Sequence, residues 1–246
     1  MDNWCGGTCA VFRVAYYLGD LDLAYKLAEY LAIVEAAENS FIAVTFGMFF
    51  RALTYNAMYR RSPKRKYRSQ TTKILRRMDM MRGKENINFL HKYLIVEADF
   101  NATYGLNPGH EKASFDNAIL KATRAGFVQD GALANELAGE FSLKNKDEFW
   151  AEYYMTKAYT MYETWQARAK TKQMLERHAK LVNLDSAMSE VFVTKRRSRK
   201  DEAMSAVSMH HTLDTDRKSS TGENGSSVFS AHFSQSGQNS SQFFMR

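Results

Sequence analysis

The sequence predicts an all-α protein built from stacked helical hairpins. Apolar side chains recur every three or four residues over positions 1–183, which is the period of helices that bury one face. Small and large apolar residues alternate along these faces, so neighbouring helices can approach closely and interlock. The chain has only two prolines and no alternating strand pattern, which argues against a sheet.

The apolar periodicity and the turn residues together predict nine helices. Asp20 can cap the second helix after Gly19 ends the first, and Gly126 can end the sixth. The turns lie at Gly19-Asp20, Ser62-Pro63, Asn107-Pro108 and Asn145-Lys146, at intervals of roughly 40 residues. The predicted helices are 10–18, 21–38, 41–59, 66–82, 87–105, 110–125, 128–144, 147–165 and 167–182.

The predicted structural core follows the large members of these apolar stripes. We expect Asn145 to cap the helix 147–165 in a capping box with Glu148. Trp165 ends that helix, and we expect it to wedge between the last hairpin and a final cap helix. The core residues predicted from the stripes are Phe89, Tyr93, Leu137, Phe141, Tyr154, Ala158, Tyr162 and Trp165.

Residues 184–246 differ in composition from the rest of the chain. Ser, Gly, Asn, Gln and Thr are frequent there, as in the segment 219–227. Such a composition buries too little apolar surface to offset the entropy of ordering. We therefore predict a helical domain at 1–183 and a disordered polar tail at 184–246.

The first residues and the apolar segments of the chain argue against a membrane-spanning or a secreted protein. The most apolar stretch, 41–50, is shorter than the ~20 residues of a membrane span, and no secretory signal opens the sequence. We expect an intracellular, cytoplasmic protein, and the basic cluster Lys195–Lys200 leaves a nuclear address open. Cys5 and Cys9 supply at most half of a zinc site, so we expect neither a metal nor a disulfide.

Several linked motifs carry a resemblance to a known family. They are Asn88-Phe89-Leu90-His91-Lys92-Tyr93 with Glu97-Ala98, Ala132-Leu133-Ala134-Asn135-Glu136-Leu137-Ala138 with Phe141, and Tyr162 with Trp165, Ala169-Lys170 and Leu175-Glu176. This pattern resembles the tetratricopeptide-like helical repeats of multidomain signalling proteins that combine a serine/threonine kinase-like domain, an AAA-type ATPase module and a sensor histidine kinase. The resemblance implies a tetratricopeptide-like α-solenoid. Gln166 departs from the pattern, because a glycine is expected there.

The catalytic motifs of those relatives are absent from the sequence. It contains no Gly-x-x-x-x-Gly-Lys-Ser/Thr phosphate loop, no His-Arg-Asp catalytic loop and no Asp-Phe-Gly. We therefore expect no enzymatic activity, no catalytic residue and no cofactor. His91 is expected to form an interhelical hydrogen bond or to lie on a helix surface, because a six-residue offset separates it from Glu97 around the helix.

The net charge of +7 makes an anionic partner electrostatically favourable. No aromatic platform or base-reading motif accompanies the basic clusters, so we expect a protein partner rather than nucleic acid. The leading hypothesis is a non-catalytic protein-interaction scaffold in intracellular signalling. The alternatives are a truncated structural fragment of a signalling kinase or ATPase, and anionic-partner binding through basic loops. The candidate contacts for that partner are Arg60, Arg61, Lys64, Arg65, Lys66 and Arg68.

Overall fold

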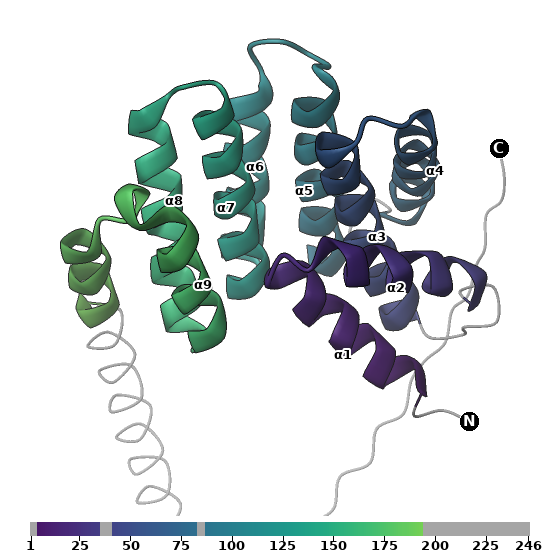
Figure 1. Cartoon of the computed structure of the whole chain (residues 1–246), viewed down its shortest axis with the longest axis horizontal. Helices are drawn as coiled ribbons and strands as arrows, with labels where there is room; N and C mark the ends of the chain where they lie inside the picture. The colour runs from purple at the N-terminus through teal and green to yellow at the C-terminus, as the bar shows by residue number, and fades with distance from the viewer. Residues whose placement is uncertain (1–3, 35–40, 83–86, 194–246) are drawn as a thin grey trace, which may run out of the picture. The chain divides into compact units, whose positions relative to one another are not determined.

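Every backbone segment described by the computed structural model is helix, turn or short connection (Figure 1). The description covers residues 4–34, 41–82 and 87–193, and it contains no strand within these ranges. All of them belong to one unit, Met1–Arg197, and the second unit of the chain, Ser198–Arg246, lies outside the described residues. The all-α prediction is therefore confirmed.

The observed helices agree closely with the predicted ones. The first helix begins six residues earlier than expected, and the ninth ends in a short 3-10 turn. The elements are α1 (Trp4–Tyr17), α2 (Leu21–Val34), α3 (Phe41–Arg61), α4 (Arg65–Arg82), α5 (Ile87–Tyr104), α6 (Glu111–Arg124), α7 (Val128–Lys144), α8 (Glu148–Thr164), α9 (Arg168–His178) and η2 (Ala179–Leu181).

Each helix from α1 to α9 packs against the next one in the chain. In addition α1 contacts α3, α3 contacts α5, and α5 contacts α7, so these four helices form one layer. The helices α2, α4 and α6 pack mainly against their chain neighbours, outside that layer (Figure 1). Consecutive helices therefore pair as hairpins, as the alternating small and large residues predict.

The middle of the core is built around α3. Fourteen of its 21 residues are buried, and Phe50 meets the rings of Phe12, Tyr16 and Tyr17 edge to face at 5.6 to 6.0 Å. Among the described residues α3 is the one helix long and apolar enough to cross a membrane, but 78% of its most apolar window is buried within the protein. Core packing accounts for its apolar composition.

The turns that follow α6, α7 and α8 share one geometry. Gly126, Lys146 and Gln166, spaced twenty residues apart, all have φ between 61° and 78°. Each turn has the paired backbone hydrogen bonds of a Schellman motif, for example from the Lys146 amide to the Leu143 carbonyl and from the Asp147 amide to the Ser142 carbonyl. Two such intervals, from Gly126 to Gln166, span forty residues, close to the interval of roughly 40 residues between the turns predicted from the sequence.

The capping prediction for α8 is wrong by two residues. Asn145 is the C-cap of α7, whereas the Asp147 carboxylate accepts a hydrogen bond from the Trp150 amide at 3.2 Å and caps α8. The left-handed Lys146 separates the two caps, which places the start of α8 later than the sequence suggested. The Asp20 cap is confirmed, since its carboxylate accepts a hydrogen bond from the Leu23 amide at 3.0 Å.

The predicted core is confirmed except at its end. Phe89, Tyr93, Leu137, Tyr154, Ala158 and Tyr162 are buried, and Phe141 is half-buried against the core. Trp165 instead is 36% exposed, and its ring lies 5.9 Å from the ring of Tyr17 in α1. The expected wedge against a final cap helix is wrong, because the first helix of the chain packs against this position.

The predicted tail begins too early. Residues 184–193 form a helix, in which Ala187 and Val191 are buried four residues apart. The side chain of Asn183 accepts a hydrogen bond from the Ser186 amide at 3.1 Å and starts this helix. Disorder was therefore the wrong prediction for these ten residues. The rest of the predicted tail, 194–246, and the cluster Lys195–Lys200 lie outside the described residues.

Candidate functional site

A pocket of about 280 Å³ lies where helices from both ends of the described chain meet. Its walls come from the α1–α2 turn, the C-terminal end of α3, the middle of α7 and the helix α9. The lining residues are Tyr16, Tyr17, Gly19, Leu21, Ala57, Arg60, Arg61, Leu133, Glu136, Leu137, Glu140, Lys170, Gln173 and Arg177.

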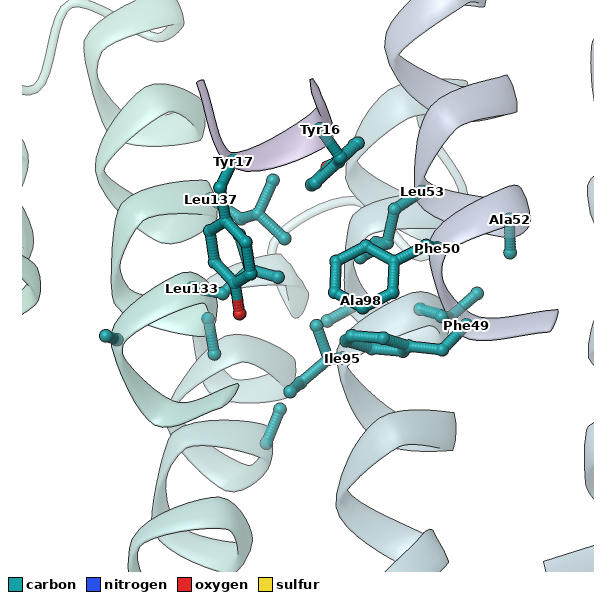
Figure 2. Close-up of a cluster of buried hydrophobic side chains, with 14 of the residues drawn as sticks. Tyr16, Tyr17, Phe49, Phe50, Ala52, Leu53, Ile95, Ala98, Leu133 and Leu137 are labelled. Atoms are coloured by element: carbon teal, nitrogen blue, oxygen red, sulfur yellow. The ribbon is translucent and has the colours of Figure 1, made fainter. Parts of the chain in front are cut away.

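The apolar wall of the pocket comes from α1 and α7. Figure 2 shows Tyr17 beside Leu133 and Leu137, and Tyr16 beside the α3 side chains. Burial raises the pKa of both tyrosine hydroxyls well above the ordinary value, so both are neutral at physiological pH. This wall is therefore uncharged, and the charge in the pocket comes from the other residues.

Lys170 is the first charged anchor of the pocket. Its ammonium group lies 2.6 Å from Glu136 Oε1, and it donates hydrogen bonds to the Tyr17 carbonyl at 2.7 Å and to Gln173 Oε1 at 3.0 Å. The Tyr162 hydroxyl donates to the second Glu136 oxygen at 2.9 Å. This buried cluster joins α1, α7, α8 and α9, so its charges are satisfied within the protein.

Arg60 is the second anchor and is also satisfied internally. Its guanidinium lies 2.6 Å from Asp99 Oδ1 and donates to Thr103 Oγ1 at 2.7 Å, both on α5. Asn56 Nδ2 donates to the other Asp99 oxygen at 2.8 Å. Arg60 is also a predicted contact for an anionic partner; α5 supplies its counter-charge within the protein, and its contact with a partner stays a prediction.

Glu140 differs from these anchors, because no ion pair or hydrogen bond holds its side chain among the described residues. It lies one helical turn after Glu136 and opens to solvent in the pocket. The surrounding protein and the nearby Glu136 carboxylate raise the pKa of Glu140, although Arg60 acts in the opposite direction. The pocket thus contains a carboxylate, that of Glu140, whose ionised form a bound cationic ligand would stabilise.

Arg177 closes the pocket against the α1–α2 turn. Gly19 has a φ of 75°, and a Cβ at this position would lie 2.6 Å from the Arg177 guanidinium nitrogens. A side chain at position 19 would therefore displace Arg177 as well as strain the turn.

A second charged cluster is buried away from the pocket. The His91 imidazole is fully buried, donates to Asp130 Oδ2 at 2.7 Å and stacks on Phe127 at 4.3 Å, and the Lys92 ammonium contacts the same carboxylate oxygen. The predicted interhelical role of His91 is confirmed. Glu97 accepts instead from the Tyr93 hydroxyl at 2.7 Å. In the described part of the chain, no three acidic, cysteine or histidine residues gather as metal ligands do.

The predicted basic loop does not form one site. Besides Arg60, Arg61 pairs with Asp22 at 2.9 Å, and the Lys66 ammonium donates to the Tyr25 hydroxyl at 2.6 Å. Lys64 is exposed and lines no described pocket, whereas Arg65 and Arg68 line an open cleft. The sequence analysis missed Lys73 and Arg76 in that cleft, although their helical spacing from Arg65 and Arg68 was visible.

No protein-family model, no curated protein and no solved structure matches this chain. The resemblance to the helical repeats of multidomain signalling proteins therefore stays a prediction.

Proposed function

We propose that this chain is a tetratricopeptide-like α-solenoid that binds a segment of a protein partner and performs no chemistry. The layered contacts of α1, α3, α5 and α7 support this arrangement. The twenty-residue spacing of the turns after α6, α7 and α8 supports it as well. A role in intracellular signalling, next to kinase or ATPase modules, rests on the resemblance of the motifs alone.

The observation that carries the proposal is Glu140, which no described residue pairs, in a pocket where the anchors Lys170 and Arg60 are already paired. Lys170 and Arg60 have counter-charges within the protein, so they hold in place the helices that form the pocket walls. Glu140 is open to a ligand, and the carboxylate of Glu136 lies nearby as a second negative charge. A partner segment that places a lysine or arginine side chain in the pocket would relieve the repulsion between the two glutamates.

A second candidate function is a structural segment within a larger helical array. Phe149 on α8 is 72% exposed, and Phe192 in the helix 184–193 is 68% exposed. A neighbouring helix in such an array would cover these two side chains. In that role the pocket would contribute only to stability.

The test is selection of peptides from a displayed random library on the whole protein. Glu140→Gln removes the free carboxylate, and Glu163→Gln removes one charge from the next helix, outside the pocket. We expect selected peptides enriched in Lys or Arg whose dissociation constant rises about tenfold in Glu140→Gln, as one lost charge-assisted contact predicts, and stays unchanged in Glu163→Gln. Peptides that bind both variants equally would refute this site, and the structural role would then be favoured.

A further inference from the structure

The helix α4 is the most cationic element described. Its eighteen residues include seven Lys or Arg and one Asp. Tyr67, Thr71, Ile74 and Met78 are buried at intervals of three and four residues, so they form the face that packs on the core. The basic residues are therefore left on the outer face, where solvent or a ligand can reach them.

Part of this outer face is a cleft of about 640 Å³. Six side chains of α4, four of them cations and two of them hydroxyls, line it together with Tyr59 and Pro63, and none of the residues that line it is acidic. Arg68 lies 5.3 Å over the ring of Tyr104, which orients its guanidinium. The six side chains, here called the α4 cleft, are Arg65, Arg68, Ser69, Thr72, Lys73 and Arg76.

The cations of the α4 cleft differ from the neighbouring ones in having no acidic partner within the part of the chain that the structure describes. Arg65, Lys73 and Arg76 form no ion pair with any residue that the structure describes, whereas Arg60 and Arg61 are paired with aspartates. Four like charges in one cleft repel one another and attract anions. An anionic ligand bound in the cleft would compensate these positive charges.

The arrangement of these charges favours a ligand with several phosphates. From Arg65 to Arg76 the helix advances about 16 Å, so the cations follow a line and do not converge on one point. A single phosphate would be held by converging side chains. Ser69 and Thr72 lie among the cations, and hydroxyls with Arg and Lys are the usual donors to a phosphodiester backbone.

We propose that the α4 cleft binds the phosphate backbone of a nucleic acid without reading its sequence. The residues that line the cleft include no Asn or Gln to read adenine edges, and apart from the ring of Tyr59 and Pro63 they lack the apolar Trp, Phe or Leu face that accompanies a basic membrane-binding helix. The sequence favoured a protein partner over nucleic acid, because no aromatic platform or base-reading motif accompanies the basic clusters. The structure places two of the predicted contacts, Arg65 and Arg68, on α4 together with Lys73 and Arg76, and among the described residues none of these four has an acidic partner. This inference is independent of the peptide pocket.

The test measures binding of fluorescein-labelled oligonucleotides, single- and double-stranded, to the whole protein by anisotropy over a range of salt concentrations. The cleft variant carries Lys73→Gln and Arg76→Gln. The control variant carries Lys121→Gln and Arg124→Gln on α6, the same two residue types at the same spacing and also exposed. Circular dichroism checks that both variants stay folded.

With four phosphate contacts we expect log K to fall with log salt at a slope of about −3.6 for a duplex and about −2.8 for a single strand. The slope is measured separately for the duplex and for the single strand, and each value is compared with its own expectation. The cleft variant should lose about half of the slope and bind about tenfold more weakly, and the control should bind as the wild type does. The pair Lys73→Arg and Arg76→Lys, which keeps the charges, should restore binding.

Three results would overturn the proposal. The first is equal weakening in the cleft and control variants, which would indicate a general charge effect. The second is absence of oligonucleotide binding by the wild type at low salt. The third is cleft-dependent binding to phosphatidylserine vesicles or to a phosphorylated peptide with no binding to oligonucleotides, which would assign the cleft to another ligand.

Discussion

The helices α7 and α4 both carry charged residues, but they use them in opposite ways. In α7, eleven of seventeen residues are buried, and its buried carboxylates at Asp130 and Glu136 are paired with cations from α5 and α9. In α4, a narrow face is buried and the cations of the cleft have no acidic partner among the described residues. Charge that is satisfied internally fixes the packing of helices, whereas unpaired charge on an outer face is available to a ligand.

The largest expected effect comes from removing a cation in each region. Lys170→Met leaves the buried Glu136 carboxylate without its counter-ion and should lower the free energy of unfolding by about 3–5 kcal/mol. Lys73→Met on α4 should change it by no more than about 0.5 kcal/mol, because the side chain is exposed and unpaired. Urea denaturation with a common m-value measures both.

The companion double variant shows whether the loss comes from the orphaned charge. Lys170→Met combined with Glu136→Leu removes both charges and should recover much of the stability, as replacement of a buried ion pair by apolar residues often does. Equal losses for Lys170→Met and Lys73→Met would remove the distinction between α7 and α4.

The contrast between α7 and α4 also explains which features of the structure can be predicted from the sequence. The helix bounds follow from local periodicity, and Gly19, Asp20 and Gly126 mark turns by their own conformational or capping preferences. The Lys170–Glu136 pair joins residues from two helices 34 positions apart, and the Lys170 contact to Tyr17 spans 153 positions. Such contacts depend on which helix, distant in the sequence, packs at that position, so the local apolar periodicity cannot predict them. Trp165 was misplaced for the same reason.

The basic cleft was different, because its signal was local and was overlooked. Arg65, Arg68, Lys73 and Arg76 recur at helical spacing within a helix whose existence was predicted correctly. The sequence analysis grouped cations by adjacency around Ser62-Pro63 and so included Arg60 and Arg61, which point to internal partners. Grouping by helix face would have found the cleft, although only the structure shows that no described acidic residue pairs with its cations.

The pH dependence of stability sharpens the comparison at the N-terminal end of α7. Burial alone would raise the pKa of Asp130, but the hydrogen bond from His91 and the charge of Lys92 outweigh it and lower the pKa. A lowered folded pKa means that the carboxylate stabilises the protein above its unfolded pKa of about 3.9, and that this contribution is lost as the pH falls through the folded value.

We therefore expect Asp130→Asn to be less stable than the wild type near neutral pH, by about 2–3 kcal/mol, because His91 and Lys92 lose their anionic partner. The difference should shrink as the pH is lowered below about 4, because the carboxylate is protonated first in the unfolded chain and then, below its lowered pKa, in the folded protein. Thermal unfolding of both proteins across this range measures the effect. A difference that stays constant down to about pH 2 would mean that the ionisation of Asp130 contributes nothing.

The smallest expected effect tests whether α7 owes its stability to buried pairs alone or also to its ends. The turn before α7 has Gly126 at a φ of 78°, and the turn after it has Lys146 at 61° with the same hydrogen bonds. A side chain at positive φ costs about 1 kcal/mol relative to glycine, so Lys146→Gly should stabilise the protein by about 0.5–1 kcal/mol. Gly126→Ala makes the reverse change in the matching turn and should destabilise it by a similar amount. Both are read from urea midpoints. If Lys146→Gly lowers stability, the entropy that glycine adds to the unfolded chain outweighs the backbone strain that it removes from the folded protein. The stability of α7 then rests on its buried charge pairs and apolar contacts.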